Sequence, residues 1–81
     1  MEQYRNLERT KIKETIKLRD EFIKLGQALI AAGLVGSGVE AKEVIIEGLV
    51  KVNGEVDTRR GKKLYDGDVV TFNGEEIKIE K

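Results

Sequence analysis

The side chains that most enzymes use for acid–base and nucleophilic chemistry are scarce in this sequence. It contains no histidine and no cysteine, which excludes the commonest general base, a thiol nucleophile and a thiolate metal site. The only serine is Ser37, and no histidine is available to activate it. This composition favours a binding protein, and we expect neither an enzyme nor a cofactor nor a small-molecule substrate.

One pair of carboxylates stands close in sequence, Asp66 and Asp68, on either side of Gly67. Two carboxylates at this spacing are candidates for general acid–base work or for a metal site. Aspartate and glycine are also the residues that tight turns favour, and an apolar segment typical of a strand follows them. We therefore interpret Asp66 and Asp68 as turn residues and expect no bound metal.

Basic side chains are the more informative feature, because they are grouped although the net charge is zero. Residues 49–63 hold five basic and two acidic side chains, whereas residues 64–81 hold two basic and five acidic ones. The basic members of the first group are Lys51, Arg59, Arg60, Lys62 and Lys63. Four cations around the flexible Gly61 favour contacts with nucleic-acid phosphates over the alternative, a solvated basic loop.

Two features of a predicted helix favour the same ligand. Ser37 and Gly38 stand at its start, where free backbone N–H groups and the helix dipole attract a phosphate, unless Ser37 merely caps its own helix. Lys42 lies at the edge of the core-facing arc beside Val39 and Ile46, and the acidic residues of the helix lie on the opposite flank. An RNA backbone is therefore expected on the lysine side, although a solvated lysine remains the alternative.

The elements that must position these residues begin with an ambiguous segment. Apolar residues alternate with lysines over residues 12–19, which predicts a strand with Ile12, Ile16 and Leu18 on one face. A helix that uses apolar residues from Leu18 to Leu29 is the competing prediction. Residues 1–10 are interpreted as a tail or a frayed helix, and residues 11–81 as a single domain.

Two helices follow. Residues 25–32 predict a short helix that ends at Gly33, a left-handed cap. A second helix begins at Ser37, where a Ser-x-x-Glu pattern predicts a capping box with Glu40, and stops at Gly48. Because four residues separate the helices, they form a helical hairpin.

The remainder of the chain predicts strands. Asn53-Gly54 marks one hairpin, but a strict two-residue turn would place Val56 on the face opposite Val52, so we expect a longer loop or a bulge there. Asn73-Gly74 marks a second hairpin, in which Val70, Phe72, Ile77 and Ile79 share one buried face. The predicted fold class is α+β, with a helical hairpin packed on a small, mostly antiparallel β-sheet.

Taken in order, these motifs resemble a known family. They are Lys24-Leu25, the Ser37–Lys42 helix start, the Glu47–Gly54 segment with its Val-Lys-Val-Asn-Gly, and Gly67-Asp68. Over about residues 22–72 they resemble the RNA-binding domain first seen in small-subunit ribosomal protein S-four, the alpha-L RNA-binding motif. The stretch from Arg59 to Tyr65 resembles its small stand-alone YaaA/YbcJ-like members.

The resemblance implies a helical hairpin against a sheet, with structured RNA, ribosomal or tRNA-like, bound across the hairpin and the adjoining strands. It places Lys24, Ser37, Lys42 and Lys51 on the RNA-facing surface. Gln27, Gly38 and Ile46 stand where the broader family commonly has basic residues, and the basic run from Arg59 to Lys63 is expected to compensate. The predicted RNA-binding residues are Lys24, Gln27, Ser37, Gly38, Lys42, Lys51, Arg59, Arg60, Lys62 and Lys63, and the seven basic residues among them are expected to form one continuous surface.

The resemblance suggests a role in ribosome assembly or translation. The main alternative is a protein-interaction module that uses the exposed Val39 and Ile46 with the acidic flank of the second helix. A ubiquitin-like sulfur carrier is disfavoured, because that class ends in Gly-Gly and this sequence reads Ile-Glu-Lys at the same place. No segment is apolar enough for a membrane span, and Met1–Arg9 is polar and charged, so we expect a cytoplasmic location. We also expect a monomer.

Overall fold

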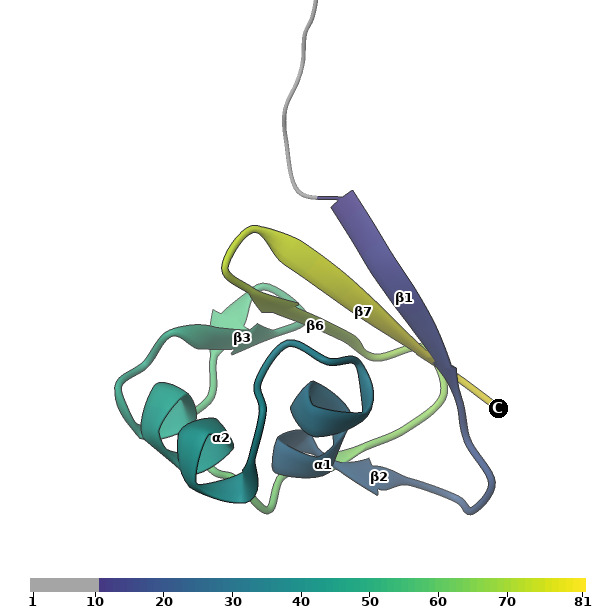
Figure 1. The fold of residues 1–81 in the computed structure, drawn as a ribbon. Coiled ribbons are helices and arrows are strands. Elements are labelled where there is room, and N and C mark those ends of the chain that lie inside the picture. The colour runs from purple at the N-terminus through teal and green to yellow at the C-terminus, as the bar shows by residue number, and fades with distance from the viewer. Residues whose placement is uncertain (1–10) are drawn as a thin grey trace, which may run out of the picture.

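The computed structural model describes residues 11–81, and the interpretation of residues 1–10 as a tail lies outside them. Two helices lie against one face of a five-stranded sheet (Figure 1). The helices are α1 (Leu25–Ala31) and α2 (Gly38–Ile46). The α+β prediction, with a helical hairpin on a mostly antiparallel sheet, is confirmed.

The sheet has the strand order β1-β7-β6-β3-β4. Its strands are β1 (Lys11–Lys17), β3 (Val50–Val52), β4 (Glu55–Val56), β6 (Val69–Phe72) and β7 (Glu75–Glu80). All neighbours are antiparallel except β1 and β7, which run side by side in parallel (Figure 1). The parallel pair joins two strands that are far apart in sequence, which a hairpin cannot do.

The ambiguous segment that begins at Ile12 is a strand, so the helical alternative is wrong. A bulge interrupts its register between Ile12 and Glu14. Ile16 and Leu18 are half-buried and pack against the core, as the alternation predicts. The sheet supplies the backbone hydrogen bonds of β1, and this pairing outweighs the local helical pattern of Leu18 and Phe22.

Both helices end as their sequences predict. After α1, Gly33 has φ 74° and the N–H of Leu34 donates to the Leu29 carbonyl. After α2, Gly48 has φ 79° and the N–H of Leu49 donates to the Val44 carbonyl. A left-handed glycine closed by such a bond satisfies carbonyl groups that the helix itself leaves without a donor.

The two Asn-Gly turns have the same geometry, which corrects the prediction for the first. Val52 pairs with Glu55, so Asn53-Gly54 is a strict two-residue turn without a bulge. Asn53 and Gly54 both have positive φ, at 52° and 86°, as a type I′ turn requires. Val56 consequently lies on the outer face of the sheet beside Lys51, 53% exposed. The short β4 at the sheet edge tolerates an exposed valine, so the turn geometry decides the register.

The core lies between the helices and the inner face of the sheet. Strands β6 and β7 contribute Val70, Ile77 and Ile79, all fully buried, as the alternation predicts. The largest fully buried side chains are Leu25, Leu29, Ile45, Val50, Leu64, Val70, Ile77 and Ile79. Phe72 shares this face but is only half-buried, because it lies at the end of β6 opposite Glu75.

A second, two-stranded sheet was not predicted. It pairs β2 (Ile23–Lys24) with β5 (Lys63–Leu64), so that Lys24 lies opposite Lys63 and Ile23 opposite Leu64. Strands of two residues leave too short an alternation to be recognised in a sequence. This small ribbon fixes the basic run beside the start of α1.

No helix within residues 11–81 is long and apolar enough to cross a lipid bilayer.

The burial pattern predicts which side chain of the second hairpin stabilises the fold most. Replacing the fully buried Ile77 by alanine should lower the free energy of unfolding by about 2–5 kcal/mol, because it leaves a cavity beneath the helices. Val56→Ala on the outer face should have little effect. Urea denaturation monitored by circular dichroism measures both, and equal midpoints for the two variants would contradict the assignment of the inner face.

Candidate nucleic-acid interface

The start of α1 is bound to the basic run. The N–H of Leu25 donates to the Lys62 carbonyl at 2.8 Å, and the N–H of Gly26 donates to the Arg60 carbonyl at 3.1 Å. The side-chain oxygen of Gln27 accepts the N–H of Lys24 at 3.3 Å. Three backbone donors that a helix start leaves without an intrahelical partner are thus satisfied. These bonds place residues 60–63 against the helical hairpin.

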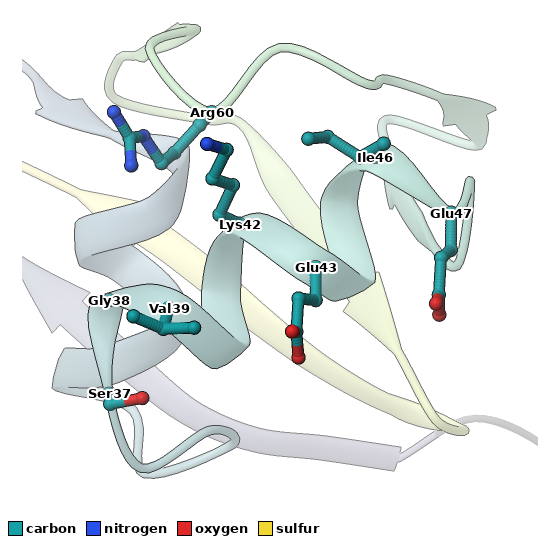
Figure 2. A pocket seen from close by; sticks show the side chains of 8 residues that line it. All are labelled: Ser37, Gly38, Val39, Lys42, Glu43, Ile46, Glu47 and Arg60. Carbon is teal, nitrogen blue, oxygen red and sulfur yellow. The ribbon is translucent and has the colours of Figure 1, made fainter.

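Gly26 makes room for the Arg60 side chain. A Cβ atom added to Gly26 would lie 2.8 Å from Cγ of Arg60, closer than carbon atoms approach without displacement. The aliphatic part of Arg60 therefore runs over the glycine, and its guanidinium group extends over α1 (Figure 2). The sequence gives no sign of this role, because Gly26 lies within the predicted helix and marks neither a turn nor a helix end.

Arg60 and Lys42 line one open groove of about 740 Å³ along α2. Figure 2 shows the two cationic side chains on the same side of the helix, whereas Glu43 and Glu47 point away from them. Ile46 and Val39 also line the groove, at 57% and 69% exposed. The groove thus has a cationic side, an acidic side and exposed apolar groups between them.

A second groove continues the first across α1. Lys24, Gln27 and Gly38 line it, and Arg60 is common to both grooves. Six of the predicted residues therefore come together on one surface, which we call the helical-hairpin surface. Its members are Lys24, Gln27, Ser37, Gly38, Lys42 and Arg60.

Two polar side chains at the start of α2, Ser37 and Glu40, have local structural roles. The Ser37 hydroxyl accepts the N–H of Glu40 at 3.2 Å and caps α2. The Glu40 carboxylate accepts the N–H of Gly36 at 2.8 Å, so the predicted capping box forms with its second bond shifted by one residue. This carboxylate already places a negative charge at the start of α2. The electrostatic attraction for a phosphate consequently depends on Lys42 and Arg60 more than on the helix terminus.

Arg59 is held away from the helical-hairpin surface. Its guanidinium group donates two hydrogen bonds to Asp57, at 2.8 and 3.0 Å, and its backbone N–H donates a third at 2.9 Å. The hydrogen bond from the Arg59 side chain lowers the pKa of Asp57, and the same contact raises the pKa of Arg59. Both groups therefore stay ionised at neutral pH, and Asp57 offsets the charge of Arg59.

The other basic residues are also dispersed. Lys62 lines a separate cleft with Arg59 beside the β3–β4 hairpin. The Nζ atom of Lys63 lies 4.8 Å from the centre of the Phe22 ring. Lys51 alternates with the buried Val50 and Val52, so it projects from the outer face of the sheet, away from the helices. The structure does not gather the predicted basic residues on one continuous surface.

Asp66 and Asp68 are engaged in turns, as predicted. The Asp68 carboxylate accepts the side-chain N–H of Asn53 at 3.0 Å and the backbone N–H of Tyr65 at 2.8 Å. The Asp66 carboxylate accepts the N–H of Lys81 at 2.9 Å. Within residues 11–81, no group of three or more histidine, cysteine or acidic side chains has a metal-binding arrangement. The expectation that no metal binds remains a prediction.

Comparison with known proteins now decides the family. The model of the S4 domain family matches residues 16–80. The chain belongs to this family. The expected resemblance to the ribosomal protein S-four domain is thereby confirmed, over a longer range than residues 22–72.

Two relatives are similar to this chain over most of their length. Probable ribosome maturation protein RlbA of Bacillus subtilis (strain 168) is 49% identical over 59 residues, which are 73% of this chain and 83% of the relative. Putative RNA-binding protein YbcJ of Escherichia coli (strain K12) is 39% identical over 57 residues, 70% of this chain and 81% of that protein. The expected resemblance to YbcJ-like members is confirmed.

The fold comparison agrees. The solution structure of YbcJ from E. coli, described as revealing an alpha-L motif involved in RNA binding, matches with a TM-score of 0.65 and 35% identity. The match covers 83% of this chain and 86% of that structure. A ribosomal large subunit pseudouridine synthase B of B. subtilis is 44% identical over 55 residues, 68% of this chain but only 22% of the synthase. What is shared with this enzyme is thus a small part of it.

The contact between Gly26 and Arg60 predicts a specific effect of adding one methyl group. Gly26→Ala should displace the Arg60 side chain from the helical-hairpin surface, because the new Cβ would lie 2.8 Å from Cγ. The free energy of unfolding should change by no more than about 1 kcal/mol, since alanine favours a helix. The NMR signal of the Arg60 side-chain N–H should shift while that of Arg59 does not. An unshifted Arg60 signal would refute the positioning role.

The two aspartates should differ in importance for stability. Asp68→Ala removes bonds to Asn53 and Tyr65 and should lower the free energy of unfolding by about 1–3 kcal/mol. Asp66→Ala, which removes a single bond, to the N–H of Lys81, should lower the free energy of unfolding less. Calorimetric titration of the unaltered protein with Mg²⁺, Ca²⁺ and Zn²⁺ should show no stoichiometric binding. Tight binding that Asp68→Ala abolishes would assign these residues a metal instead.

Proposed function

We propose that this protein is a non-catalytic module that binds structured RNA through the helical-hairpin surface. The observation that carries the proposal is the convergence of Lys42 and Arg60 on one groove, with Lys24 on its continuation. These cations come from three segments of the chain and point to one open surface. Their grouping suits successive phosphates of one RNA strand. S4 domain membership and the names of RlbA and YbcJ support the same ligand.

The charge distribution favours one orientation of the bound RNA. The chain has no net charge, so it exerts no strong overall attraction on a polyanion. Glu43 and Glu47 would repel phosphates from the far side of the α2 groove, whereas Lys42 and Arg60 attract them. The RNA backbone is therefore expected to lie on the α1 side of α2. Recognition by phosphate position and helix shape suits folded RNA better than an extended strand.

The name of one relative supports a more specific proposal. A close relative is named as a probable ribosome maturation protein, so we propose ribosomal RNA, or a tRNA-like structure, as the target and ribosome assembly or translation as the process. The protein is proposed to act as a cytoplasmic monomer with residues 11–81 as its single binding domain. Catalysis is not proposed, because the match to the pseudouridine synthase covers 22% of that enzyme.

A second function has one observation in its favour. Val39 and Ile46 are 69% and 57% exposed, next to Glu43 and Glu47 on α2. Exposed apolar residues beside acidic ones also suit contact with a basic protein. The two functions make opposite demands on Lys42 and Arg60, which are essential for RNA and unfavourable for a basic partner. Their replacement therefore separates the two.

Replacing Lys42 and Arg60 together by alanine should weaken binding to purified B. subtilis 16S and 23S ribosomal RNA and reduce its salt dependence. If each side chain neutralises one phosphate, the log–log slope of affinity against salt should flatten by up to about two units. Fluorescence anisotropy across a salt series measures both quantities. The thermal midpoint should hardly change, because both side chains are exposed.

The matched control is Lys51→Ala with Lys78→Ala. Both lysines project from the outer face of the sheet, and the change in net charge is the same. If both double variants weaken binding equally, only general charge attraction remains and the proposed surface is wrong. If neither variant matters and Ile46→Asp abolishes capture of ribosomal proteins, the protein-interaction function replaces RNA binding.

A further inference from the structure

The outer face of the small ribbon combines two aromatic rings with two lysines. Ile23 and Leu64 pack into the core from one face of the β2–β5 ribbon, so the alternate pair, Lys24 and Lys63, lies on the other face. Next to this pair, the Phe22 and Tyr65 rings lie 6.0 Å apart, tilted by 53°. We call these four residues the aromatic–lysine patch: Phe22, Lys24, Lys63 and Tyr65.

The core does not account for these aromatic rings. Neither Phe22 nor Tyr65 belongs to the hydrophobic core or to the side chains packed against it. Tyr65 is 48% exposed and Phe22 is half-buried. Phe72, the other aromatic residue within the described part of the chain, does pack against the core. Two large rings kept together at the surface, with cations beside them, indicate contact with a ligand more than a contribution to stability.

The chemistry of the patch matches one kind of ligand. Aromatic faces stack on nucleic-acid bases, and lysines bind the phosphates that flank a base. The Lys63 ammonium group lies 4.8 Å from the Phe22 centroid, so it occupies one face of that ring. The Tyr65 ring is the more exposed of the two and remains available for stacking. The ligand therefore needs a planar base and adjacent negative charges.

The patch is continuous with the helical-hairpin surface, because Lys24 belongs to both. From this juxtaposition we infer that the aromatic–lysine patch binds an unpaired nucleotide of the RNA, whose base stacks on Tyr65 while Lys24 and Lys63 contact its flanking phosphates. The inference rests on the proposed RNA binding and refines it. Bases inside a helix are stacked on one another, so only a loop, bulge or strand end offers such a nucleotide. The bound RNA accordingly has a helix next to an unpaired position.

Two RNA probes and three variants test this. One probe is a fluorescein-labelled stem–loop with an unpaired hexanucleotide loop, and the other is a blunt duplex with the same number of phosphates. Tyr65→Leu keeps an apolar side chain but removes the ring, and it should weaken stem–loop binding about tenfold without changing duplex binding. Tyr65→Phe should retain the affinity of the unaltered protein. Because the chain has no tryptophan, Tyr65→Trp adds a reporter whose fluorescence the stem–loop should quench and the duplex should not.

The possible results distinguish failure of base stacking on Tyr65 from failure of RNA binding as a whole. If Tyr65→Leu leaves stem–loop binding unchanged while the Lys42 and Arg60 double variant weakens both probes, the stacking inference is overturned and the proposed function stands. The inference also fails if Tyr65→Leu weakens both probes equally, or if the stem–loop does not quench Tyr65→Trp. If the unaltered protein binds neither probe nor ribosomal RNA, the proposed function itself fails. Circular dichroism melting of each variant confirms that the fold is retained.

Discussion

Two backbone hydrogen bonds join the start of α1 to the segment from Arg60 to Lys62, and the helical-hairpin surface depends on them. The N–H groups of Leu25 and Gly26 donate to the carbonyls of Lys62 and Arg60. A helix start must find acceptors for such groups, and here the acceptors come from the basic run itself. Satisfying the helix thereby also fixes the side chain of Arg60 over Gly26 and sets Lys63 opposite Lys24.

The same arrangement explains how a chain without net charge can present a cationic surface. Arg59 and Arg60 are adjacent in sequence, yet Arg59 is paired with Asp57, whereas Arg60 lines one groove with Lys42 (Figure 2). On α2, Lys42 lies on one side of the groove, and Glu43 and Glu47 on the other. This separation of positive from negative side chains is felt by a ligand in the groove, because screening by salt confines the interaction between surface charges to about 10 Å.

Local patterns determined much of the fold. Gly33 and Gly48 end the helices, Ser37 caps α2, and Asn73-Gly74 closes a hairpin whose buried face alternates as expected. In each case the signal and the structure lie within a few residues of each other, so chain geometry alone suffices. Local reasoning was wrong at Asn53-Gly54, where the preferred two-residue turn outweighed the tendency to bury Val56.

The sequence by itself determined the two helices, the two hairpins and the family, and it grouped lysines and arginines near a helical hairpin. Only the tertiary structure decided which of these basic residues share one surface. It paired Arg59 with Asp57, turned Lys51 to the outer face of the sheet, and laid Arg60 over Gly26 so that it lines one groove with Lys42. It also placed Tyr65 beside Phe22, more than 40 residues away in the chain. The physical reason is that side-chain direction and long-range pairing depend on how the elements pack, which no local pattern encodes.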